Sequence, residues 1–150
     1  MNIDKYFEGF NLNKHVSPYS KYEEILSKDI SIDKIKGLIP LSVTPLSYDD
    51  HAGFEAIAFE FDDKIVMLHH WSDCCESVWI ESIVGDLQDL VGNPLLMVEE
   101  SVGDYDQADG SGTWTFYKFA TIKGYVDIRF IGESNGYYSE NVDITEYYKV

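Results

Sequence analysis

The stretch TWTFYKFATIKGYVDIRFI, residues 113–131, decides the fold. Both halves are rich in β-branched and aromatic residues, and Lys123-Gly124 supplies turn chemistry between them. The stretch therefore predicts a β-hairpin with strands at 113–122 and 125–131. The first strand places Trp114, Phe116, Ala120 and Ile122 on one face, interrupted by Lys118, and the second aligns Val126, Ile128 and Phe130.

Further strands are predicted on both sides of this hairpin. Residues 54–61 and 64–71 are predicted as two strands joined by the short turn Asp62-Asp63. Residues 41–44 lie between two prolines, as in an edge strand. Shorter β-prone runs are found at 77–81, 94–101 and 137–148. Because the connections are short, we expect an antiparallel sheet throughout.

Helices are predicted mainly near the N-terminus. Ser17-Pro18 resembles a helix start, apolar residues recur at helical spacing up to Lys36, and Gly37 can end the segment. A second short helix is predicted at 84–91. The expected fold class is α+β, mainly antiparallel β-sheet with short N-terminal helices. Residues 1–40 would form an N-terminal helical extension and residues 41–150 a β-rich zinc-binding domain, together one compact unit.

The segment His69 to Glu76, HHWSDCCE, contains both cysteines and two of the four histidines. Zinc prefers thiolate and imidazole ligands in a tetrahedron, and His70, Cys74 and Cys75 supply three within a short segment. We expect His51 to be the fourth ligand, with Asp73 and Glu76 as local alternatives. The spacing matches no standard zinc finger. Two buried, inert thiols are the competing interpretation, together with a hydrogen-bonded core histidine; a disulfide between neighbours is discounted as strained.

Four motifs carry a resemblance to a known group of proteins. These are His-x-x-Asp-Cys-Cys-Glu at 70–76, the segments 85–92 and 113–130, and GESNGYYSE at 132–140. Together they resemble a family of small uncharacterised bacterial and phage proteins over roughly residues 40 to 145. A small, acidic, zinc-bearing phage protein is also similar to the anti-CRISPR inhibitors of the RNA-guided type II effector nuclease. The resemblance favours a metal at the His-Cys-Cys segment and gives no reaction.

The chain is strongly acidic, with 27 acids against 11 lysines and arginines and a net charge of −16. Direct nucleic-acid binding is disfavoured, because phosphate contacts need basic side chains. An acidic surface is instead attracted to a basic protein surface, although acidity also serves solubility. The N-terminus lacks a signal-peptide pattern, and no apolar run is long enough to span a membrane. We expect a cytoplasmic protein in a bacterial host cell.

Enzyme motifs are absent from the sequence, which has no nucleophile elbow, Walker loop or zinc-deaminase pattern. The leading hypothesis is a non-enzymatic inhibitor that binds a basic surface of the type II effector and hinders its loading with DNA. A zinc-dependent hydrolase of unknown substrate is the alternative, since three protein ligands would leave one zinc position for water. An acidic housekeeping protein is a third possibility.

Overall fold

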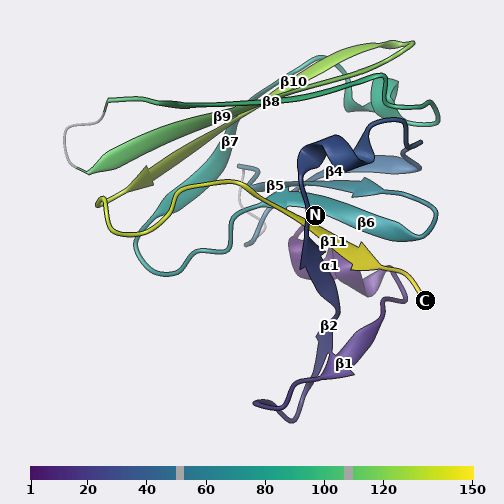
Figure 1. Cartoon of the computed structure of the whole chain (residues 1–150), viewed down its shortest axis with the longest axis vertical. Coiled ribbons are helices and arrows are strands. Elements are labelled where there is room, and N and C mark those ends of the chain that lie inside the picture. The colour runs from purple at the N-terminus through teal and green to yellow at the C-terminus, as the bar shows by residue number, and fades with distance from the viewer. Residues whose placement is uncertain (50–52, 107–109) are drawn as a thin grey trace.

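The computed structural model describes residues 1–49, 53–106 and 110–150 of the chain. Strands account for 51% of the residues and helical turns for 10%. The strands form three antiparallel sheets (Figure 1). The elements are α1 (Ile3–Glu8), β1 (Lys14–Val16), β2 (Glu23–Ile25), β3 (Ser27–Asp29), the 3-10 helix η1 (Ile32–Ile35), β4 (Ser42–Leu46), β5 (Ala56–Glu60), β6 (Lys64–His69), β7 (Ser77–Val84), the 3-10 helix η2 (Leu87–Leu90), β8 (Met97–Asp104), β9 (Ser111–Thr121), β10 (Gly124–Ser134) and β11 (Asp143–Tyr148).

Two of the sheets pack face to face around the main core. The larger has the strand order β3-β11-β6-β5-β4 and the smaller β7-β10-β9-β8, and Figure 1 shows the smaller sheet lying across the larger. Phe59 and Leu68 of the larger sheet meet Tyr117, Phe119 and Ile128 of the smaller one, and all five are fully buried. The protein is therefore a β-sandwich whose stability comes mainly from apolar burial between the layers.

The second face of the larger sheet is also covered. Helix α1 packs Ile3 and Tyr6 against Ala58, Met67 and Tyr147 in a separate apolar cluster. The helix starts at Asn2, whose side chain accepts the amide hydrogen of Lys5. Because β5 and β6 are buried on both faces, their sequences read as continuous apolar runs and not as alternating ones.

The predicted hairpin at residues 113–131 is confirmed as β9 and β10, and their register pairs Phe119 with Val126 and Tyr117 with Ile128. The buried row of β9 contains Tyr117 and Phe119, whereas Trp114 and Phe116 are half-buried on the outer face. The expected edge strand is also present as β4, which ends the larger sheet.

The α+β prediction with several helices is wrong, because the fold is mostly antiparallel sheet with one short α-helix in the described chain. The expected helix between Ser17 and Lys36 is replaced by β2, β3 and the single turn η1. Short helices have little stability on their own, so hydrogen bonds between the backbone of this segment and neighbouring strands stabilise it more than a helix would. Near residues 84–91 only the turn η2 forms, with Asp86 accepting the amide hydrogen of Gln88.

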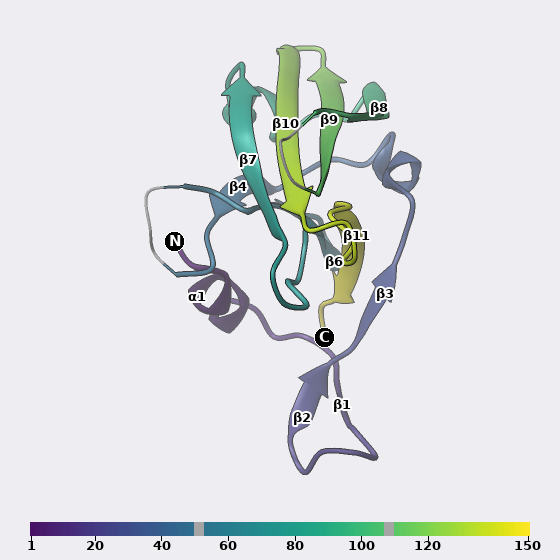
Figure 2. The same ribbon diagram turned by 90° about the vertical axis from the view of Figure 1, so that its left-hand side faces the viewer.

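The first forty residues contribute directly to the sandwich. Strand β3 pairs with β11, with Asp29 opposite Thr145, and η1 buries Ile32 and Ile35 in the main core. The β1–β2 hairpin extends away from both large sheets (Figure 2). Among the described residues, no helix has the length and apolarity needed to cross a membrane.

Candidate functional site

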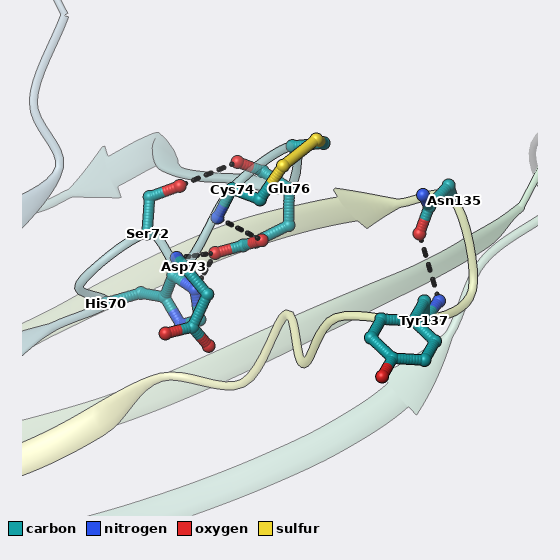
Figure 3. Close-up of a disulfide and its surroundings, with 8 residues drawn as sticks. His70, Ser72, Asp73, Cys74, Glu76, Asn135 and Tyr137 are labelled. Atoms are coloured by element: carbon teal, nitrogen blue, oxygen red, sulfur yellow. Dashed lines mark hydrogen bonds and ion pairs between the residues drawn. A yellow bond between two sulfur atoms is a disulfide. The ribbon is translucent and has the colours of Figure 1, made fainter.

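The loop between β6 and β7, residues 70–76, contains three of the four predicted zinc ligands (Figure 3). His70 directly follows β6 and Glu76 directly precedes β7, so the two residues stand at the base of the loop. Both are buried, and Nε2 of His70 lies 3.1 Å from Oε1 of Glu76. The His70 imidazole therefore contacts the carboxylate of Glu76, which the sequence predicts only as an alternative zinc ligand.

The Glu76 carboxylate organises the loop from inside. It accepts the amide hydrogen of Asp73 and, at 3.3 Å, that of Cys74, while Oγ of Ser72 donates to the Glu76 carbonyl at 3.3 Å. Burial disfavours the charged carboxylate, but the hydrogen bonds from Asp73, His70 and Cys74 outweigh it and lower the pKa of Glu76 to about 2. Glu76 is therefore ionised at neutral pH, and its carboxylate is the common acceptor for His70, Asp73 and Cys74.

His70 is tied to the rest of the fold through its remaining polar groups. Its Nδ1 lies 2.7 Å from the carbonyl oxygen of Asn141, and Oδ2 of Asp143 is 4.0 Å away. The hydroxyl of Tyr48 donates to the His70 backbone carbonyl. Both ring nitrogens of His70 therefore face oxygen acceptors.

Cys74 and Cys75 are joined to each other by a disulfide bond and are exposed to solvent. The expectation that neighbouring cysteines do not bridge is therefore wrong, and so is the interpretation of both as buried thiols. A disulfide sulfur is not the thiolate that zinc requires. Within the described chain, no group of three His, Cys, Asp or Glu side chains is placed to hold a metal ion. His51 lies outside the described residues. The zinc site remains a prediction for the reduced chain.

His69, which the sequence places on the opposite face from His70, is also buried. Its Nε2 lies 2.9 Å from Oγ1 of Thr145, and this hydroxyl donates to Oδ1 of Asp29 at 3.1 Å. Burial lowers the pKa of His69 to about 4, although the Asp29 charge opposes the shift. His69 is therefore a neutral histidine that links β6, β11 and β3.

An acidic hollow lies next to this network, and sequence reasoning missed it. It has a volume of about 440 Å³ and is bordered by the carboxylate residues Asp29, Asp33, Glu100 and Asp143. Burial raises the pKa of Asp143, with Asp29 and Asp73 adding to the shift and His70 opposing it. These acids come from β3, η1, β8 and β11, so only the pairing of distant strands brings them together, and no local sequence pattern reveals it.

By its fold the protein is an antiparallel β-sandwich, and the hollow lined by acidic residues opens between the edges of its two large sheets. The chain belongs to the DUF7448 family, described as a domain of unknown function, whose model matches residues 23–144. No curated protein and no solved structure matches the chain. The family match begins at β2 and ends within β11, so it includes both the disulfide loop and the acidic hollow.

Proposed function

We propose that this protein is a non-enzymatic acidic binding protein that occupies a basic, nucleic-acid-binding surface of a partner protein. The observation that carries the proposal is the acidic hollow, which has four carboxylate residues and neither lysine nor arginine in its lining. The chain as a whole carries a net charge of −16, which gives the protein a negative long-range field. Such a field accelerates the approach of a basic surface and selects against acidic partners and nucleic acid.

The distribution of the basic residues supports the same proposal. Lys149 Nζ lies 2.7 Å from Oε2 of Glu60, and Lys64 Nζ lies 3.1 Å from Oε2 of Glu146. The Arg129 guanidinium also pairs with an acid of its own sheet, Glu81. These three cations are paired within the protein, and among the described residues no ion pair joins a lysine or arginine to an acid of the hollow.

The sequence resemblance indicates which partner to test first. An RNA-guided type II effector nuclease holds its nucleic acids in a positively charged channel, the kind of surface that an acidic protein can occupy in place of DNA. In this proposal the protein acts in the cytoplasm of a bacterial cell and hinders loading of the effector with DNA. Neither the alternative hydrolase activity nor a housekeeping role gains a specific observation from the structure.

The test is an order-of-addition cleavage assay with purified effector, guide RNA and target DNA. We expect cleavage to be suppressed when the protein is added before the DNA and to persist when the DNA is bound first. The protein alone should leave the DNA intact, which separates inhibition from nuclease activity. Undiminished cleavage at a large excess of the protein added first would refute the type II effector as partner. Binding to other basic nucleic-acid-binding proteins would then have to be measured.

A further inference from the structure

The disulfide between Cys74 and Cys75 contributes little to holding the fold together. A disulfide stabilises a protein mainly by closing a loop of the unfolded chain, and the effect grows with the length of that loop. Cys74 and Cys75 are neighbours in sequence, so their bond encloses no other residue. Both residues are exposed, so the bond also adds no packing to the core. The reactivity of the two sulfur atoms is therefore the property of this pair that a function can use.

The loop has a framework that does not depend on the bond between the sulfur atoms. The Glu76 carboxylate accepts the amide hydrogens of Asp73 and Cys74 and lies 3.1 Å from Nε2 of His70. The hydroxyl of Ser72 donates to the Glu76 carbonyl. None of these hydrogen bonds involves a sulfur atom, so reduction of the disulfide leaves each of their donors and acceptors in place.

The sulfur atoms are open to attack from solvent. His70 and Glu76 are buried at the base of the loop, whereas Cys74 and Cys75 are exposed (Figure 3). Thiol–disulfide exchange begins when a thiolate attacks a disulfide sulfur, so its rate depends on access to that sulfur. Exposed disulfides are for this reason the labile, regulatory or catalytic ones.

We propose that Cys74 and Cys75 form a thiol–disulfide exchange site that accepts two electrons from a dithiol. One thiolate of the dithiol attacks a sulfur of the pair, which breaks the bond between Cys74 and Cys75 and forms a mixed disulfide. The displaced cysteine leaves as a thiolate and takes up a proton. The second thiolate of the dithiol then displaces the other cysteine, which takes up a second proton. The dithiol ends as a disulfide and the pair ends as two thiols.

The adjacency of the two cysteines favours a dithiol over a monothiol as the reductant. The cysteine that is displaced first lies next to the mixed disulfide, so it can attack and close the original bond again. A dithiol competes with this reversal through its own second thiol, in an intramolecular step, whereas a monothiol needs a second molecule. The dithiol of a Cys-x-x-Cys protein meets this requirement.

The charge around the loop disfavours an anionic reductant such as glutathione. The sequence has no lysine or arginine between Lys64 and Lys118. The exposed Asp73 directly precedes Cys74, and Glu76 follows Cys75. Glutathione carries net negative charge in addition to its thiolate, so it is repelled more strongly than a reductant whose only charge is the attacking thiolate.

Reduction would be measured on the full chain in the presence of a metal chelator, by quenching with iodoacetamide and counting alkylated cysteines by mass spectrometry. Dithiothreitol, 2-mercaptoethanol and glutathione would be compared at equal thiolate concentration. We expect dithiothreitol to reduce the folded protein at least about tenfold faster than 2-mercaptoethanol, and glutathione to be the slowest. Equal rates with dithiothreitol and 2-mercaptoethanol would overturn the assignment of a dithiol. Alkylation that requires urea would overturn the exchange site itself.

The state of the fold after reduction separates an exchange site from a structural bond. We expect the reduced protein to keep its circular dichroism and tryptophan fluorescence spectra. The disulfide should form again when dithiothreitol is removed and 2-hydroxyethyl disulfide is added. Unfolding on reduction, or failure of the pair to reoxidise, would contradict the proposal.

The chain offers a matched pair of variants for the charge effect. Asp73→Asn removes one charge beside the disulfide, whereas Asp62→Asn removes one from an exposed position in the turn between β5 and β6, at the other end of β6. We expect Asp73→Asn to speed reduction by glutathione about threefold, as for the loss of one exposed charge interaction, and Asp62→Asn to leave the rate unchanged. Equal rates for the two variants would overturn the local charge as the reason that glutathione is disfavoured.

Discussion

Oε1 of Glu76 and Nε2 of His70 lie 3.1 Å apart at the base of the loop between β6 and β7. The two side chains are almost fully buried, while the disulfide that they support is exposed. Glu76 also accepts amide hydrogens from Asp73 and Cys74. The ionised carboxylate of Glu76 therefore holds the loop through hydrogen bonds to His70, Asp73 and Cys74. These bonds fix the backbone at Cys74 and so position the disulfide.

Glu76→Gln tests this arrangement. The amide has nearly the same shape but no charge, and its NH₂ group would face the donors that now point at a carboxylate. We therefore expect a lower urea midpoint of unfolding with the fold retained. Glu8→Gln, at an exposed position of α1, is the control. An equal midpoint for Glu76→Gln and the unaltered protein would show that the carboxylate does not hold the loop.

The disulfide should contribute little to global stability. The bond closes no intervening residues, so it removes little conformational freedom from the unfolded chain. We expect Cys74→Ser/Cys75→Ser to change the free energy of unfolding by less than about 1 kcal/mol. Denaturant unfolding of the double variant measures this. A loss of several kcal/mol would mean that the bond, and not Glu76, organises the loop.

Zinc binding provides a separate test of the sequence-based metal site. The oxidised protein should bind no zinc through Cys74 and Cys75, because their sulfurs are bonded to each other. If His70, Cys74, Cys75 and His51 are ligands, the reduced protein should bind one equivalent with release of protons. The Cys74→Ser/Cys75→Ser variant should lose this binding. Absence of zinc in both redox states, measured by metal analysis after dialysis, would remove the metal from the account.

The substitution Gly103→Ala tests the packing of Trp114 on the outer face of the smaller sheet. An added Cβ at this position would overlap the indole ring of Trp114, which lies over the glycine backbone. We expect Gly103→Ala to displace the ring and destabilise the protein by about 1–3 kcal/mol. Tryptophan fluorescence and urea unfolding would report both changes. Ser101→Ala, two residues away on the same strand, should have a much smaller effect.

A pH dependence is predicted for the ion pair between Glu146 and Lys64. Burial would raise the pKa of Glu146, but hydrogen bonds from Tyr148 and Lys64 outweigh it and lower the pKa below the ordinary value of 4.5. The pair therefore stabilises the fold above that pH and loses its contribution as the pH falls. The difference in unfolding free energy between the unaltered protein and Glu146→Gln should be larger at neutral pH than near pH 3. A difference independent of pH would contradict the assignment.

The sequence predicted the strands better than it predicted the helices or the site. The hairpin at 113–131 is set by local β-propensity and its turn, and it is present as expected. The helix predicted at 17–36 is replaced by β2, which pairs with the nearby β1, and by β3, which pairs with the distant β11, as between Asp29 and Thr145. Tertiary pairing of this kind overrides weak local helix signals.

The candidate site also depends on tertiary contacts that the local sequence does not reveal. The motif contains both His70 and Glu76, but the sequence predicts Glu76 only as an alternative to His51 for the fourth zinc ligand and does not reveal its direct contact with the imidazole. The hollow between Asp29, Glu100 and Asp143 could not be predicted, since it depends on which sheet edges meet when the sandwich closes. Charge composition did indicate the class of partner that we propose.

The most direct test of the central claim is a salt series of binding isotherms between this protein and purified RNA-guided type II effector loaded with guide RNA. We predict stoichiometric binding whose dissociation constant rises steeply with ionic strength, with target DNA excluded from the complex. Absence of binding at low salt, or a complex that still takes up target DNA with unchanged affinity, would contradict the account.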